Sequence, residues 1–164
     1  LSKPEALARI DQYWFPYHRA LQRLLSRAHA CFGYSLLIDM HSMPHEAVAH
    51  LGKPNQGIDV VLGDRYGASA DIALGDLIEQ AFETHKFRVS RNVPFAGAYI
   101  TQRYGQPGQS KHVVQVELDR ALYLDEVEVA PSERFEELKD RLKSVLGYVI
   151  EETAQPPANR LAAE

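Results

Sequence analysis

Cysteine is nearly absent from this 164-residue chain, and its scarcity restricts the available chemistry. The one cysteine, Cys31, excludes an intrachain disulfide and any zinc site built from several thiolates. Because Cys31 falls on the apolar stripe of an expected helix, we interpret it as structural rather than nucleophilic. A lone cysteine fits a reducing compartment, so a cytoplasmic location is expected. Any metal site must therefore use histidine and carboxylate ligands.

An excess of positive charge and long apolar runs are also missing. Eighteen Lys and Arg stand against 22 Asp and Glu, which gives a net charge of −4 and no basic field for nucleic-acid phosphates. No stretch approaches the roughly 20 apolar residues of a membrane span, and no secretory signal opens the sequence. We therefore expect neither nucleic acid nor a membrane as a partner, whereas the oligomeric state stays open.

The composition that is present, 45% hydrophobic and 24% charged, suits one domain with an ordinary core. We expect a single α/β domain over residues 1–152 and a frayed tail over 153–164. The first helix begins at Ser2, whose hydroxyl and the following Pro4 are typical of a helix N-terminus. Its apolar stripe ends at Gly33, and Pro16 should bend or split it.

Short apolar segments alternate with helical patterns along the rest of the chain. Strands are expected at 35–42, 58–62, 87–90 and 113–118, helices at 70–86 and after 132, and long loops at 43–57 and 91–111. The segment 35–42 is a nearly continuous apolar run that ends abruptly in polar residues, a pattern typical of a strand buried on both faces. This alternation predicts a layered α/β domain with a largely parallel sheet, in which ligands bind beyond the carboxyl ends of the strands.

The most informative residues, Asp39 and His41, lie near the carboxyl end of the expected strand at 35–42. The two are separated by one position, so their side chains share a face, and the carboxylate is suited to orient the imidazole as a metal ligand or base. The alternative is a strand-end histidine that bonds to backbone. His45 follows in a proline-containing loop, where its spacing from His41 has no helical meaning.

Glu117 lies inside the apolar strand at 113–118, where a carboxylate needs either a partner or a task. Next to a metal-bound water it would act as a general base, and otherwise it would form an ion pair with Arg120 or another arginine. No G-x-S-x-G motif surrounds Ser42 or Ser69, so a serine nucleophile is not indicated.

Arg91, Asn92 and Arg103 bracket the loop that follows residue 90. Guanidinium groups bind carboxylates through paired hydrogen bonds, which makes these residues candidates for substrate binding. The alternative is a solvated loop with surface arginines. The glycine-rich segment 62–67 lacks the Lys-Ser/Thr of a phosphate loop and is better interpreted as a turn.

Five blocks in one order resemble the N-formylglutamate amidohydrolase family. They are YWFPYH at 13–18, LIDMHSMP at 37–44, LGDRYG at 62–67, SRNVPFAGAYIT at 90–101 and QVELDRALY at 115–123. The resemblance covers most of residues 12–150 and is to the later part of the family's domain. It implies a zinc-carboxypeptidase-like fold, a three-layer α/β/α sandwich with a largely parallel or mixed sheet of the phosphorylase/hydrolase type.

The resemblance also implies site roles. His41 matches a zinc-ligand histidine with Asp39 behind it, Glu117 matches the general base, and Arg91, Asn92 and Arg103 would bind the carboxylates of a small amide substrate. His18, His45 and His112 would have supporting roles. The family's earlier segment, which supplies the first histidine and another Zn²⁺ ligand, has no counterpart here. We therefore expect weak zinc binding unless His45 or His112 substitutes, and an exposed sheet edge.

Three functions follow as hypotheses. The first is metal-dependent hydrolysis of N-formyl-L-glutamate or a similar N-acyl amino acid. The second is a catalytically incomplete domain, a folded remnant or a subunit that acts only with a partner. The third is a small-anion or nucleotide binder that uses residues 63–67, which the absent lysine disfavours.

Overall fold

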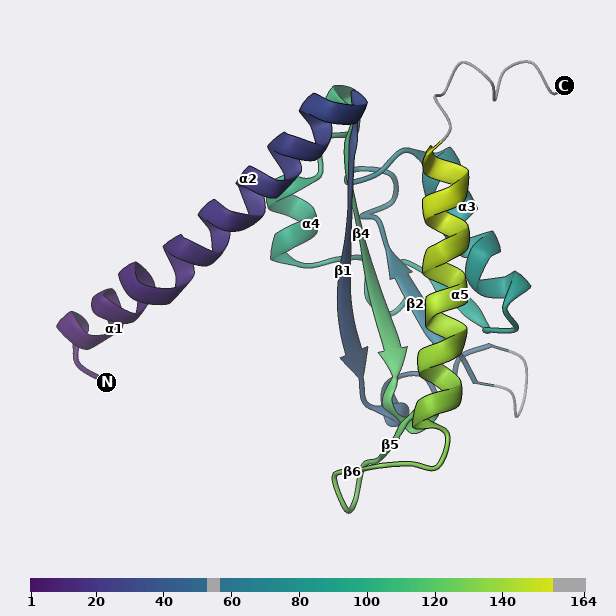
Figure 1. The fold of residues 1–164 in the computed structure, drawn as a ribbon. Coiled ribbons are helices and arrows are strands. Elements are labelled where there is room, and N and C mark those ends of the chain that lie inside the picture. The colour runs from purple at the N-terminus through teal and green to yellow at the C-terminus, as the bar shows by residue number, and fades with distance from the viewer. Residues whose placement is uncertain (53–56, 155–164) are drawn as a thin grey trace, which may run out of the picture.

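A computed structural model describes residues 1–52 and 57–154 and shows a mixed β-sheet with helices on both sides (Figure 1). Helices α3 (Ile72–Thr84) and α5 (Phe135–Ala154) lie on one side of the sheet. Helix α4 (Tyr99–Tyr104) and the end of α2 (Phe15–Phe32) lie on the other. The predicted three-layer α/β/α class is confirmed.

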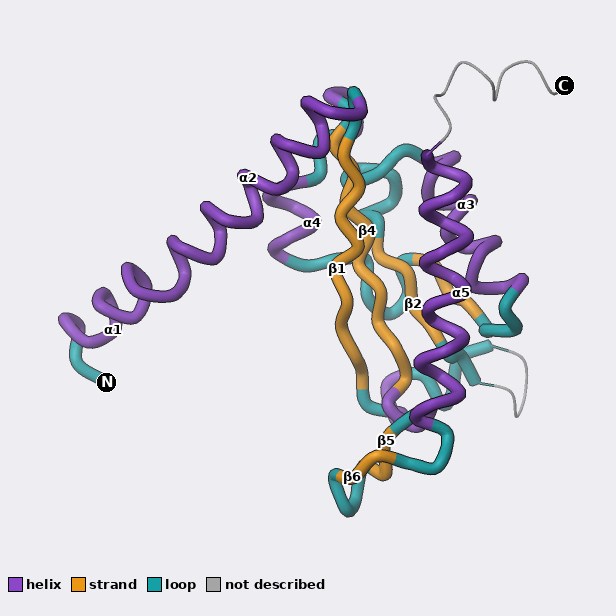
Figure 2. Tube along the Cα trace, viewed as in Figure 1, coloured by secondary structure: helices purple, strands orange, loops and turns teal. Residues whose placement is uncertain are grey.

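The main sheet has the strand order β1-β4-β2-β3, of which Figure 2 labels β1, β4 and β2. Its strands are β1 (Ser35–Met43), β4 (Lys111–Asp119), β2 (Val60–Gly63) and β3 (Val89–Arg91). The long strands β1 and β4 run parallel, whereas β2 runs antiparallel to β4 and parallel to β3. Along the strand direction, the carboxyl ends of β2 and β3 therefore lie at the opposite end of the sheet from the carboxyl ends of β1 and β4.

The N-terminal helical region has the predicted start, break and end. The Ser2 hydroxyl accepts a hydrogen bond from the Glu5 amide, and α1 spans Lys3–Arg9. A π-helical turn at Ile10–Trp14 separates α1 from α2, directly before Pro16, which has no amide hydrogen to donate. Gly33 ends α2 with φ 76°, the left-handed conformation that a glycine adopts without a Cβ penalty.

The larger core cluster lies between the sheet and the helices α3 and α5, and it contains Val60, Leu62, Val114, Val116, Ile78 and Val145. A smaller cluster of Met43, Val48, Ile58 and Val61, with Phe95 against it, lies apart from it. Even-numbered residues of β4 supply the larger cluster, so the odd-numbered ones face the other way. That other face carries polar groups.

Strand β1 differs from the sequence prediction of burial on both faces. It is an edge strand, most of its residues are only partly buried, and Met40 is 45% exposed. Its apolar run is the same as in a central strand, but in this structure only β4 pairs with it. The predicted exposure of a sheet edge is thus confirmed.

Other boundaries shift by a few residues. The predicted loop 91–111 contains α4, and a two-stranded pair, β5 (Leu124–Asp125) and β6 (Ala130–Pro131), precedes α5. Helix α5 continues to Ala154, so the first two residues of the predicted tail are helical, and 155–164 lie outside the described residues. Among the described helices, none has the length and apolarity needed to cross a lipid bilayer.

Candidate functional site

Four polar side chains meet on one face of the β1–β4 pair. Asp39 and His41 on β1 lie opposite Gln115 and Glu117 on β4 in a parallel register. Neighbouring strands are about 5 Å apart, and residues two apart point to the same face, so the four side chains form a compact square. The sequence-predicted pair, His41 and Glu117, is thus brought together on the same face.

Glu117 is a buried carboxylate, 9% exposed, and is held by a chain of hydrogen bonds. The Gln115 side-chain amide donates to Glu117 Oε1 at 2.9 Å, and the Ala98 amide donates to Gln115 Oε1, also at 2.9 Å. Burial raises the pKa of the Glu117 carboxyl above its usual value, an effect that the charges of His41 and Arg120 only partly oppose. A carboxyl with a raised pKa next to an imidazole is suited to accept a proton.

The alternative explanation for Glu117, an ion pair with Arg120, is not realised. The Arg120 guanidinium instead donates to the hydroxyl of Ser42 and lies 3.8 Å from Glu126. No ion pair joins Glu117 to any residue of 1–52 or 57–154. The burial of Glu117 therefore lacks the structural compensation that an ion pair would provide.

His41 is the accessible member of the site. Its side chain is 42% exposed, and its Nε2 lies 3.0 Å from Asp39 Oδ2, which leaves Nδ1 for another partner. The carboxylate–imidazole pair is typical of metal-ligating or proton-transferring histidines. Over residues 1–52 and 57–154, however, no three His, Cys, Asp or Glu side chains gather closely enough to hold a metal ion. The described residues therefore do not supply the three ligands of a catalytic zinc site.

His45 forms a second carboxylate–imidazole pair that the sequence did not reveal. Its Nδ1 lies 2.7 Å from Oδ2 of the buried Asp119, and Asp119 Oδ1 accepts the Ala121 amide at 3.0 Å. Asp119 follows Glu117 by two positions and so shares its face. Gln115 and Asp119 were both missed, although their two-residue spacing from Glu117 in an apolar strand was a usable signal.

Arg91 and Asn92 stabilise a turn rather than facing the His41–Glu117 pair. Arg91 Nε donates to the buried Asp64 at 3.0 Å, and its guanidinium also pairs with Asp76. The Asn92 side chain donates to Asp64 Oδ1 at 2.8 Å and accepts the Asp64 amide. Burial raises the pKa of Asp64, but the hydrogen bonds from Arg91, Asn92 and Gly67 outweigh it and hold this pKa below its usual value.

The direction of β3 explains this placement. A fully parallel sheet would have brought the end of β3 to the edge where β1 ends, but β2 and β3 run the other way. The loop after Asn92 then returns over the polar face, where Phe95 packs against the smaller core cluster and the Ala98 amide donates to Gln115. Residues 65–67 form a turn, as predicted, whereas Leu62 and Gly63 end strand β2.

Arg103 is exposed and lines a cavity of about 200 Å³ together with Lys111 and residues of α2. Lys111 begins β4, and Glu117 follows six positions later, a separation of about 20 Å along the strand. The structure therefore does not bring Arg103 beside Glu117.

His18 and His112 are buried in structural surroundings. His18 Nδ1 lies 2.7 Å from the Tyr104 hydroxyl, so it joins α2 to α4. Burial lowers the pKa of His112, which lies near the start of β4 and accepts a weak hydrogen bond from the Asp71 amide at 3.4 Å. Neither histidine belongs to the His41–Glu117 cluster.

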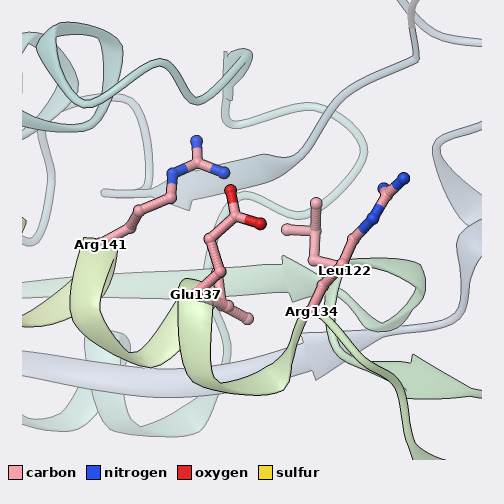
Figure 3. Close-up of a pocket in the computed structure, with 5 residues that line it drawn as sticks. Leu122, Arg134, Glu137 and Arg141 are labelled. Atoms are coloured by element: carbon pink, nitrogen blue, oxygen red, sulfur yellow. The ribbon is translucent and has the colours of Figure 1, made fainter.

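A cavity of about 280 Å³ lies away from these residues, at the start of α5 (Figure 3). Arg134, Glu137 and Arg141 extend from the α5 region at this cavity, and Leu122 closes one side. Arg141 donates to the His85 carbonyl and lies 3.9 Å over the Phe87 ring, so it is engaged in packing. None of the sequence-predicted site residues lines this cavity.

Comparison with known sequences gives a consistent family. Residues 1–124 match the family model described as N-formylglutamate amidohydrolase. Over 151 residues, 92% of this chain, the sequence is 36% identical to the N-formylglutamate deformylase of Pseudomonas aeruginosa. Over 122 residues, 73% of this chain, it is 38% identical to the N-formylglutamate deformylase of Pseudomonas putida. These matches cover 55% and 44% of the two proteins, so the chain spans about half the length of the curated relatives it matches.

Solved structures agree. The crystal structure of an N-formylglutamate amidohydrolase from Ralstonia eutropha JMP134 is similar with a TM-score of 0.82 at 28% identity, covering 97% of this chain and 56% of that one. A protein from Agrobacterium tumefaciens is similar with a TM-score of 0.64 at 16% identity, covering 94% of this chain and 57% of that one, which speaks to the fold alone.

Proposed function

Since this chain belongs to the N-formylglutamate amidohydrolase family, we propose that its polar square serves hydrolysis of the amide bond of N-formyl-L-glutamate or a similar N-acyl amino acid. The observation that carries the proposal is the buried Glu117 carboxyl, which has no ion-pair partner among the described residues and lies in register with the accessible His41. The names of the two Pseudomonas relatives, both N-formylglutamate deformylases, support the same reaction.

Glu117 acts as the general base. It accepts a proton from a water molecule while the water oxygen attacks the acyl carbon, and it then passes that proton to the leaving nitrogen as the C–N bond breaks. The products are formate and the free amino acid. Gln115 positions Glu117, because its amide holds one carboxylate oxygen and leaves the other for the water.

Zinc is the metal that the family resemblance implies, and its chemistry would be to polarise the acyl carbonyl and the water. His41, oriented by Asp39, is the candidate ligand on this chain. The described residues do not complete a zinc site, so we propose that the remaining ligands come from polypeptide outside them. Substrate binding by Arg91, Asn92 and Arg103 stays a prediction, and Arg91 would have to exchange one of its acidic partners for substrate.

The incomplete ligand set favours a second candidate function, a subunit that is active only with a partner polypeptide. Metal analysis of the purified chain separates the two candidates. Stoichiometric zinc supports a self-sufficient enzyme, and a content well below one ion per chain supports the partner-dependent subunit.

The proposed reaction is tested by formate release from N-formyl-L-glutamate, with and without added zinc. Turnover that Glu117→Gln reduces at least 1000-fold supports the base role, whereas full turnover in this variant excludes it. Glu133→Gln is the matched control, because Glu133 is exposed just before α5 and should leave the rate unchanged. Absence of turnover in the unaltered chain contradicts self-sufficient hydrolysis.

A further inference from the structure

The cavity beside Arg103, of about 200 Å³, lies between α2, α4 and the start of β4 (Figure 1). The His18 ring nitrogen lies 2.7 Å from the Tyr104 hydroxyl, which joins α2 to α4. The Gln106 amide donates to the Lys111 carbonyl at 2.8 Å, which joins the segment after α4 to β4. These contacts hold the cavity walls in place without help from a ligand. The volume is below the roughly 300–1,000 Å³ typical of drug-sized ligand sites, so it suits a small ligand.

Hydrogen-bond donors line this cavity from all three elements. Its polar lining residues are Gln22 and Ser26 on α2, Arg103 on α4, Gln106 after α4, and Lys111 on β4. Lys111 Nζ donates to the neutral side chain of Gln109 at 3.2 Å, and Arg103 lies 6.0 Å from the centre of a tyrosine ring. No carboxylate of residues 1–52 or 57–154 forms an ion pair with either cation. Two positive charges therefore share one cavity without an anion to neutralise them.

Helix α2 adds positive charge beside the cavity, although the chain as a whole has a net charge of −4. The helix contains Arg19, Arg23 and Arg27 and no aspartate or glutamate. Residues three apart are neighbours on a helix, so Arg19 lies beside Gln22, and Arg23 lies beside Ser26. Within the described part of the chain, none of these three arginines forms an ion pair. Like charges four residues apart destabilise a helix, and an anion bound beside them would relieve that repulsion.

We propose that the cavity beside Arg103 binds a small tetrahedral oxyanion, either free phosphate or the phosphate group of a small ester. Arg103 and Lys111 supply two positive charges, and the hydroxyl of Ser26 and the side-chain amides of Gln22 and Gln106 supply neutral donors. Donors that come from three elements can surround a tetrahedral anion, whereas a planar carboxylate is already matched by one guanidinium fork. Because the bound anion would contact all three elements, it should stabilise the folded chain.

This oxyanion site is separate from the His41–Glu117 pair. Lys111 and Glu117 lie about 20 Å apart along β4, so an anion in the cavity would not reach the buried carboxyl. The proposal therefore does not rest on the proposed hydrolysis. It competes with the predicted role of Arg103 in binding a substrate carboxylate, and the same separation disfavours that role.

The test titrates the full chain with inorganic phosphate at constant ionic strength, which is kept with sodium chloride so that general screening does not change. Calorimetry should show one-to-one binding with a Kd of about 1 mM or below, and the amide NMR signals of Ser26 and Gln106 should shift. Arg103→Gln and Lys111→Gln should each weaken binding about tenfold or more, because each removes a charge-assisted hydrogen bond. Arg134→Gln is the matched control, since it removes the same charge from an exposed arginine at the other cavity and should leave the affinity unchanged.

Two further ligands identify the kind of anion. Glycerol 3-phosphate that binds more tightly than inorganic phosphate assigns the site to a small phosphate ester, and weaker binding assigns it to free phosphate. Glutarate, a dicarboxylate, should bind more weakly than either. Thermal unfolding of each variant identifies any that fail to fold. The proposal is overturned if phosphate binding does not saturate, if glutarate binds as tightly as phosphate, or if Arg134→Gln weakens binding as much as Arg103→Gln does.

Discussion

Replacing Glu117 with glutamine should make this protein more stable at neutral pH, which is unusual for a buried polar residue. Burial raises the pKa of the Glu117 carboxyl, so its charged form is disfavoured in the folded state. The folded chain then binds a proton more tightly than the unfolded chain, whose carboxyl titrates near 4.5. Stability therefore falls as the pH rises from about 4.5 through the folded-state pKa, and the full cost is present above it.

The size of the stability change depends on which interactions Glu117→Gln preserves. The introduced glutamine side chain has the same shape as glutamate, and its carbonyl oxygen can still accept from the Gln115 amide, so only the charge is removed. An incompletely compensated buried polar group costs about 1–3 kcal/mol, and the nearby charges of His41 and Arg120 offset part of the cost. We expect a gain of about 1 kcal/mol at pH 7.5 and none near pH 4. For a chain of this size that gain raises Tm by about 2–4 °C.

The assay is thermal and urea unfolding followed by circular dichroism at pH 4 and pH 7.5. Glu133→Gln, which removes an exposed carboxylate, should show no pH-dependent difference from the unaltered chain. If Glu117→Gln is instead less stable at pH 7.5, then the folded structure stabilises the carboxylate, as an ion pair would. That result would contradict the interpretation of Glu117 as a residue held at a cost for its chemistry.

Three further predictions concern the scaffold. Asp64→Asn should lower the free energy of unfolding by about 2–3 kcal/mol at pH 7, because it removes the buried negative charge that pairs with the Arg91 guanidinium. Urea unfolding measures this loss. The pKa of Asp64 is lowered, so its contribution is complete above pH ~4 and is lost as the pH falls further; the loss caused by Asp64→Asn should shrink accordingly in acid. Gly33→Ala should lower stability by about 1 kcal/mol since φ is 76° there, whereas Gly147→Ala, within α5 and with open space at its Cβ, should raise stability by about the same amount. Equal effects of the two glycine substitutions in calorimetry would contradict this assignment.

Much of the architecture was predictable because it depends on local patterns. The Ser2 cap, the break before Pro16 and the stop at Gly33 each follow from the chemistry of one residue. The alternation of apolar segments likewise predicted the order of the elements. Strand direction was not predictable in this way, because a short apolar run has the same sequence pattern in a parallel strand and in an antiparallel strand.

The candidate site, too, was predictable from the sequence only in part. From the sequence alone, Glu117 and His41 stood out, because a charged residue in an apolar strand is costly and because ligands bind beyond the carboxyl ends of strands, where His41 was expected. Only the tertiary structure decided which groups surround them, because strand pairing sets these neighbours across dozens of residues. It placed Gln115 beside Glu117 and the already predicted Asp39, and it paired Asp119 with His45.

The loop bracketed by Arg91 and Arg103 does not bring these arginines to the His41–Glu117 pair. Its sequence carries the right chemistry for a carboxylate, but the reversed direction of β3 directs Arg91 toward Asp64, and α4 holds Arg103 at the far end of β4. The sequence by itself determined which residues have side chains suited to such chemistry, since that depends on their own functional groups and immediate neighbours. The fold alone decided which of them meet, because proximity between distant segments arises from sheet topology and from the burial that accompanies it.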